Sequence, residues 1–65
     1  MNCIFDNISE VAKSKKIPLY VVEKKAGLAA GAISKWKYVN PRINNLLAVA
    51  MVLGVSINRL TQNRD

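Results

Sequence analysis

The sequence contains no histidine, a single cysteine at Cys3 and only four acidic residues among 65. Without histidine, one cysteine leaves no credible zinc site, and it also excludes an intramolecular disulfide. Scattered carboxylates and a cysteine without a neighbouring base form no catalytic constellation. We therefore expect no enzyme activity, no metal, no cofactor and no small-molecule ligand. Cys3 is interpreted as a small hydrophobic residue rather than a nucleophile.

Long apolar runs are lacking as well. The longest, 46–53, is far shorter than the roughly 20 residues that cross a bilayer. At the N-terminus the charges follow the apolar residues, which is not the order of a signal peptide. The single cysteine suits a reducing compartment. We therefore expect a cytoplasmic protein without a membrane partner. A cationic membrane-active chain is a weaker alternative, because the apolar residues are divided among short faces.

The chain is rich in positively charged and in apolar residues. Lysine and arginine number 10 against 4 acids, a net charge of +6, and 51% of the residues are hydrophobic. This composition predicts one small domain, 1–65, whose fold buries about 60% of the surface of the unfolded chain. The charge indicates a polyanionic partner, nucleic acid first and an anionic membrane surface second. The alternative is a cationic surface that serves solubility alone.

The apolar spacing predicts an all-α chain, with helices over about 3–14, 18–26, 30–38, 43–53 and 57–61. Asn2 is the expected N-cap of the first helix, Pro18 the first residue of the second, and Ser56 the N-cap of the fifth. Gly27 and Gly54 stand where a helix ends in a left-handed residue. The polar tail, 62–65, is expected to fray.

The expected core takes one face of each helix. In the second helix, Glu23 is expected to face outward with Lys24 and Lys25. Trp36 lies three residues after Ile33, so packing is favoured over stacking on a base. The apolar face of the fourth helix is expected to comprise Ile43, Leu46, Leu47, Ala50, Met51 and Leu53.

The segments GLAAGAISKWK and NPRINNLLAVAMVLGVSINRL resemble the phage-repressor/Cro-type helix-turn-helix, or XRE family, over roughly 4–60. The resemblance implies a compact five-helix, lambda-repressor-like domain whose second and third helices form the helix-turn-helix. It further implies a small transcriptional regulator that binds double-stranded DNA with its third helix in the major groove, and that could act as a homodimer.

Carried over by position, the resemblance assigns base-facing and phosphate-contacting residues. The base-facing set is Ala30, Gly31, Ser34 and Lys35. The phosphate-contacting set is Lys37, Tyr38, Asn40 and Arg42, to which Lys35 can add. The chain departs from the family at Ala29, where Ser or Thr often caps the third helix, and at Leu19, where a Gln commonly bonds a phosphate.

Three alternatives stay open at this stage. The small residues 29–32 could accept another protein, which would make the domain an adaptor or antirepressor without sequence-specific DNA binding. Lys13, Lys15 and Lys16 suit either the dipole of the first helix or a nucleic-acid backbone. Apolar residues of the fifth helix region could form a dimer interface or fill the core; they are Val55, Ile57 and Leu60.

Overall fold

The computed structural model describes residues 4–61, which form five helices around one core. The helices are α1 (Ile4–Ser14), α2 (Leu19–Ala26), α3 (Ala32–Lys35), α4 (Ile43–Leu53) and α5 (Ile57–Thr61). The bounds of α4 and α5 coincide with the predicted ranges. The expected roles of Asn2, Cys3 and the tail 62–65 fall outside the described residues.

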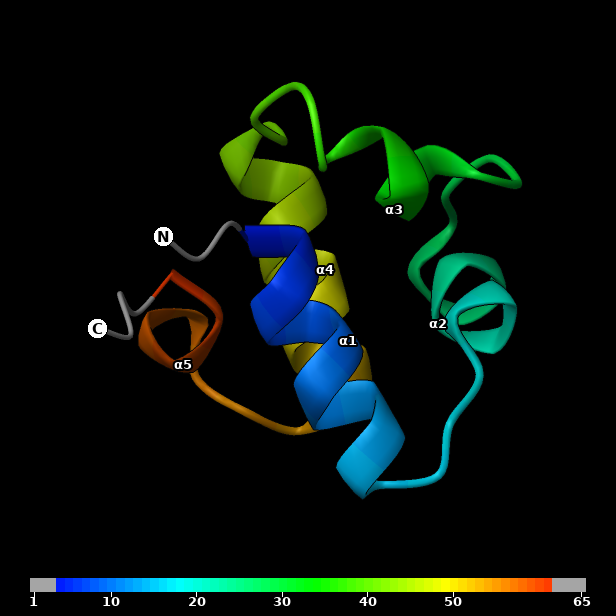
Figure 1. The fold of residues 1–65 in the computed structure, drawn as a ribbon, viewed down its shortest axis with the longest axis vertical. Helices are drawn as coiled ribbons and strands as arrows, with labels where there is room; N and C mark the ends of the chain where they lie inside the picture. The colour runs from blue at the N-terminus through cyan, green and yellow to red at the C-terminus, as the bar shows by residue number, and fades with distance from the viewer. Residues whose placement is uncertain (1–3, 62–65) are drawn as a thin grey trace.

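Figure 1 shows how the elements are placed. α1 and α4 run along the long axis of the molecule, α5 flanks one side, and α2 with α3 flanks the other. α2 packs against α4, and α1 packs against α5 and α2. The connection from α3 to α4 lies at one end of the longest axis, whose Cα extent is 30 Å, and the C-terminal end of α1 lies at the other.

The core is built from apolar side chains of all five helices. Its fully buried members include Ile8, Val22, Ile33, Val49 and Leu60. Trp36 is also buried, which confirms that it packs rather than presenting its ring for base stacking. Burial of Leu60 likewise assigns it to the core, while Val55 and Ile57 pack against the core from partly exposed positions.

The apolar face of α4 differs from the prediction. Leu46, Val49, Ala50 and Leu53 are buried, whereas Ile43, Leu47 and Met51 are exposed. α4 is apolar around most of its circumference, so hydrophobicity alone gave too little contrast to orient it. The packing against α2 and α5 selects the face that includes Val49, which the prediction omitted.

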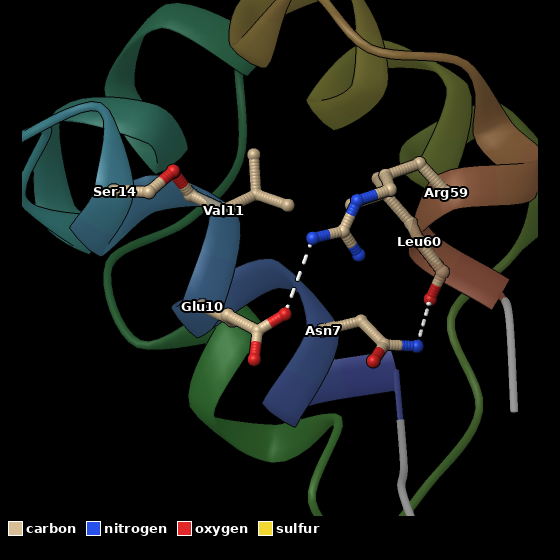
Figure 2. Close-up of polar contacts among 6 residues, drawn as sticks. All are labelled: Asn7, Glu10, Val11, Ser14, Arg59 and Leu60. Atoms are coloured by element: carbon tan, nitrogen blue, oxygen red, sulfur yellow. Dashed lines mark hydrogen bonds and ion pairs between the residues drawn. The ribbon is translucent and has the colours of Figure 1, made fainter. Parts of the chain in front are cut away.

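Polar contacts attach the last helix to the first (Figure 2). Buried Asn7 donates a hydrogen bond from Nδ2 to the Leu60 carbonyl at 2.7 Å. On the adjacent surface, Arg59 Nη2 lies 3.1 Å from Glu10 Oε1. A third hydrogen bond lies within α1 itself, where the Ser14 hydroxyl donates to the Val11 carbonyl. The Asn7 side chain therefore holds α5 against α1 through a buried hydrogen bond.

The ends of α1 and α2 follow backbone rules, with two differences from expectation. Pro18 precedes α2 as its N-cap instead of forming its first turn, and its carbonyl accepts from the Val21 and Val22 amides. Gly27 ends α2 at φ 76°, as predicted. At the end of α1 the left-handed position is occupied by Lys16, at φ 59°, a conformation that costs a residue with a Cβ about 1–2 kcal/mol.

Candidate nucleic-acid interface

The corner between α2 and α3 is shaped by two glycines. Gly27 turns the chain out of α2, and Leu28 then packs part of its side chain against the core. Ala29 and Ala30 are exposed, and Gly31 lies at φ 82° immediately before α3. A left-handed residue cannot belong to a right-handed helix. The predicted start of the third helix at residue 30 is therefore wrong, and Ala30 and Gly31 precede the helix.

The end of α3 also comes earlier than the predicted residue 38. After Lys35 the backbone continues in tight turns, because the amides of Trp36, Lys37 and Tyr38 each donate to a carbonyl three residues back. Such bonds have the geometry of a 3₁₀ helix rather than an α-helix. The extension keeps the chain compact from Ala32 to Tyr38, although the α-helix itself has only four residues.

Glu23 holds the start of α3 in place. The residue is only 6% exposed. Oε1 accepts a hydrogen bond from the Gly31 amide at 3.1 Å, and Oε2 accepts one from the Ile33 amide at 3.0 Å. The outward orientation predicted for Glu23 is therefore wrong. The amides at a helix start need acceptors, and no side chain of α3 or of its N-cap residue supplies one. The carboxylate takes the place of the Ser or Thr cap that the chain lacks at Ala29.

This contact had a partial signal in the sequence. Glu23 is the sole acidic residue between Val11 and Arg64, and it lies one helical turn before Gly27. A run of Ala and Gly at a helix start leaves amide groups without side-chain acceptors nearby. Together these facts mark Glu23 as a candidate cap. Only the relative placement of α2 and α3 shows that the carboxylate reaches the amides.

Burial of one face of α3 leaves its other face open. Ile33 and Trp36 turn into the core, whereas Ser34 and Lys35 are exposed. Ala30 and Gly31 are exposed as well, so all four residues of the predicted base-facing set lie on the surface. Polar groups on this surface come from Ser34 and Lys35, because Ala30 and Gly31 offer backbone and methyl groups only.

The predicted phosphate-contacting residues occupy the connection between α3 and α4. Lys37, Tyr38, Asn40 and Arg42 are all exposed there. Lys37 also has a partner in α1, since its Nζ lies 4.7 Å from the centroid of the Phe5 ring. A cation over an aromatic face at an exposed site contributes roughly 0.5–1 kcal/mol. That contact joins the connection to the first turn of α1 and limits the freedom of the Lys37 side chain.

The charge on the described surface is strongly biased toward cations. Within residues 4–61, the ion pair is Glu10 with Arg59, and Glu23 is buried in the α3 cap. Exposed cations without an ion pair in this range number eight; they are Lys13, Lys15, Lys16, Lys24, Lys25, Lys35, Lys37 and Arg42. Two of the three described acids, Glu10 and Glu23, thus already have partners. Few negative charges on the described surface are left to offset its positive potential.

The described part of the chain holds no group of three or more Cys, Asp or Glu side chains that could bind a metal ion. Over residues 4–61, no helix has both the length and the apolar character that crossing a bilayer requires.

Comparison with known proteins identifies the fold. No protein-family model matches the sequence, and no curated protein is significantly similar to it. Among solved structures, the chain matches the P22 c2 repressor protein, crystallised with synthetic operator 9T in the presence of Tl⁺. The TM-score is 0.84 and the sequence identity 27%, and the match covers 98% of this chain and 100% of that one. The compact five-helix fold inferred from the sequence is therefore confirmed, as is the resemblance to phage repressors.

Proposed function

We propose that this chain, which has the lambda-repressor-like helix-turn-helix fold, is a small transcriptional regulator that binds double-stranded DNA. The fold shared with an operator-bound repressor supports DNA as the partner. In our proposal α3 enters the major groove and α2 crosses the backbone above it. The groove is wide enough for a helix and presents a different pattern of donors and acceptors for each base pair.

One observation carries the proposal. A buried carboxylate fixes the start of α3, while the outer surface of the same segment stays exposed at Ser34 and Lys35. Reading bases requires side chains held in one orientation, because a displaced donor loses its bond to the base edge. Glu23 thus acts as a positioning residue. It orients the helix and, because it is buried, makes no contact with DNA in this proposal.

Phosphate contacts are proposed for the exposed groups beside α3. Lys35, Lys37 and Arg42 supply charge, and Tyr38 and Asn40 supply neutral donors. Arg42 is the N-cap residue of α4, where a cation opposes the helix dipole. A bound phosphate would offset that penalty. Arg59 is a poorer candidate because it is paired with Glu10, and Arg64 lies outside the described residues.

We expect the start of α2 to make fewer contacts with the DNA backbone than it does in a typical repressor. Leu19 has no group that bonds a phosphate, and Pro18 has no amide hydrogen. Few side chains of the α3 surface can bond to bases, and each good bidentate contact supplies about 1–3 kcal/mol of discrimination. We therefore propose that phosphate contacts dominate affinity. The ratio of specific to non-specific binding should lie near the low end of the roughly 10³–10⁷ range.

Titration with duplex DNA over a range of salt concentrations tests the proposal. Three cations at the interface predict that log K falls with log salt concentration with a slope near −3 per chain, at about −0.9 per phosphate. A Lys35→Gln, Lys37→Gln, Arg42→Gln triple variant should lose measurable binding. The proposal fails if the wild-type chain binds no duplex at low salt. That result would favour a protein-interaction adaptor or antirepressor, which uses the exposed small residues Ala29, Ala30 and Gly31 and tolerates the triple change.

A further inference from the structure

An open hollow of about 410 Å³ lies at the corner between α1 and α2. Its lining combines apolar residues with two lysines. The apolar residues come from the last turn of α1, the connection and the start of α2; they are Ala12, Ile17, Pro18 and Leu19. The lysines are Lys13 and Lys16. We call this feature the corner hollow.

Backbone hydrogen bonds fix the shape of the corner hollow. The Ile17 amide donates to the Ala12 carbonyl at 2.9 Å, and the Lys16 amide donates to the Lys13 carbonyl at 3.1 Å. This pair of bonds is the Schellman motif, in which a left-handed residue ends a helix. Lys16 is that residue, at φ 59°, and Ile17 directly after it packs against the core. The motif therefore holds both lysines and an apolar residue at one corner.

The described acidic residues leave both lysines of the corner hollow without an ion pair. Glu10 pairs with Arg59, and Glu23 is bound to the start of α3. The other acid within residues 4–61, Asp6, lies in the first turn of α1, whereas the corner hollow lies at its last turn. The negative end of the α1 dipole, equivalent to about half a charge, offsets only part of the two positive charges. The corner hollow therefore keeps a positive potential that attracts an anion.

The apolar part of the lining favours a protein over DNA as the source of that anion. A phosphate backbone would meet the lysines but has no large apolar group to cover Ile17 and Leu19. The C-terminal end of α1 also lies at the opposite end of the long axis from the α3–α4 connection, where the proposed phosphate contacts are (Figure 1). A protein segment with carboxylates on both sides of one large apolar side chain fits the lysines and the apolar lining together.

We propose that the corner hollow is the docking surface for an acidic segment of a partner protein. One large apolar side chain of the segment covers Ile17, Pro18 and Leu19. Carboxylates on either side of it pair with Lys13 and Lys16. Exposed ion pairs and one anchoring side chain give weak association, with a dissociation constant on the order of 0.1 mM. The contact uses none of the residues proposed to touch DNA, so it can be tested without assuming the proposed function.

The experiment is selection from a random peptide library on the immobilised chain, without DNA. Enriched peptides should carry Asp or Glu on both sides of one large apolar residue. One enriched peptide is then synthesised with a fluorescent label, and its affinity is measured by anisotropy at about 0.15 M salt. A serine in place of its apolar residue should weaken binding at least about tenfold, because the apolar lining would then stay uncovered.

Variants of the chain locate the peptide site. Lys13→Gln, Lys16→Gln should weaken binding of the peptide about fivefold or more. Lys24→Gln, Lys25→Gln is the matched control, because it makes the same change in net charge in the last turn of α2, where neither lysine lines the corner hollow. It should change the affinity by about twofold or less, since salt screens charges outside the contact. Circular dichroism and urea unfolding establish that both double variants fold.

The proposal is overturned if the selection enriches no acidic peptides with an apolar residue, or if the serine peptide binds as tightly as its parent. Unchanged peptide affinity of the Lys13→Gln, Lys16→Gln variant would overturn it too. Loss of binding in the Lys35→Gln, Lys37→Gln, Arg42→Gln variant instead would assign the peptide to the proposed DNA surface. A reduced salt slope of duplex binding in the Lys13→Gln, Lys16→Gln variant, with no effect on the peptide, would assign the corner hollow to the DNA backbone. Both of these results contradict docking of an acidic segment in the corner hollow.

Discussion

Glu23 in α2 and Ile33 in α3 are joined by a hydrogen bond of 3.0 Å, in which the Ile33 amide donates to Glu23 Oε2. The second carboxylate oxygen accepts from the Gly31 amide. Both groups of the first bond are buried, so the bond is shielded from competition with water. One buried ionisable side chain therefore helps to set the orientation of α3 relative to α2, together with the packing of Ile33 in the core.

Replacement of Glu23 should loosen α3 and destabilise the fold. Glu23→Gln keeps the shape but leaves one oxygen to accept and turns an NH₂ group toward an amide donor. We expect a loss of about 1.5–3 kcal/mol of unfolding free energy, the range for a hydrogen bond to a charged group. Urea denaturation followed by circular dichroism measures that loss. Asp6→Asn, at an exposed acid in the first turn of α1, is the control and should cost less than about 1 kcal/mol, the upper value for a surface charge beside a helix terminus.

A local readout separates the cap from general destabilisation. In native-state hydrogen exchange, the Gly31 and Ile33 amides of Glu23→Gln should lose more protection than core amides of α4 such as that of Val49. We expect the additional loss to be about tenfold or more. An equal loss of protection at all three amides would contradict the positioning role assigned to Glu23.

Lys16 offers a test of backbone strain at the α1–α2 corner. Its φ of 59° is unfavourable for a side chain with a Cβ, whereas glycine adopts it readily. Lys16→Gly should therefore stabilise the fold by up to about 1 kcal/mol, after the larger conformational entropy of glycine in the unfolded chain is subtracted. The reverse change at Gly54, which has φ 70°, should destabilise: Gly54→Ala is expected to cost about 1 kcal/mol. Urea unfolding compares both variants with the wild type.

The Asn7 hydrogen bond to Leu60 should contribute more to the unfolding free energy than the surface ion pair between Glu10 and Arg59. Its Nδ2 donates to the Leu60 carbonyl in the buried contact between α1 and α5 (Figure 2). Asn7→Ala leaves that carbonyl without its donor and should cost about 1–3 kcal/mol. Glu10→Gln, which removes a partly exposed ion pair, should cost less than about 1 kcal/mol. Thermal unfolding would contradict this ranking if Glu10→Gln were the more damaging change.

The salt dependence of DNA affinity should identify which cationic side chains contact phosphates. Arg42→Gln should weaken binding to all duplexes alike and reduce the magnitude of the salt slope by about 1. Lys15→Gln is a matched control, because Lys15 directly follows α1, whose C-terminal end lies at the opposite end of the long axis from the α3–α4 connection (Figure 1). It should leave the slope unchanged. Equal slopes for wild type and Arg42→Gln would remove Arg42 from the interface.

Local signals predicted most of the fold. Gly27 and Gly54 each follow an apolar helical pattern directly, and glycine adopts the positive φ of a helix end without steric cost, so the ends of α2 and α4 could be predicted. Trp36 and Ile33 were assigned to the core from their spacing, since three residues place them on one face of a helical turn. These features depend on neighbours in the chain, and so a sequence pattern is sufficient to predict them.

Features that depend on two helices at once were not predicted. Glu23 turns inward because the start of α3 lies beside it, and the sequence marks Glu23 as a candidate cap without placing α3 next to it. Gly31 was placed inside the third helix, since its residue type does not reveal whether φ is positive. Met51 was placed in the core because it is apolar, yet it is exposed once α2 and α5 select the other face of α4. Tertiary contacts decided all three.

Selection of bound sequences from a random duplex pool tests the central claim most directly. We expect the wild-type chain to retain duplexes at low salt and to enrich a short motif modestly. In a parallel selection, Ser34→Ala and Lys35→Gln should flatten that motif at one or two positions, each by about 1–3 kcal/mol of discrimination. No retention of any duplex would contradict DNA binding. A strong motif that both variants leave unchanged would contradict base reading by α3.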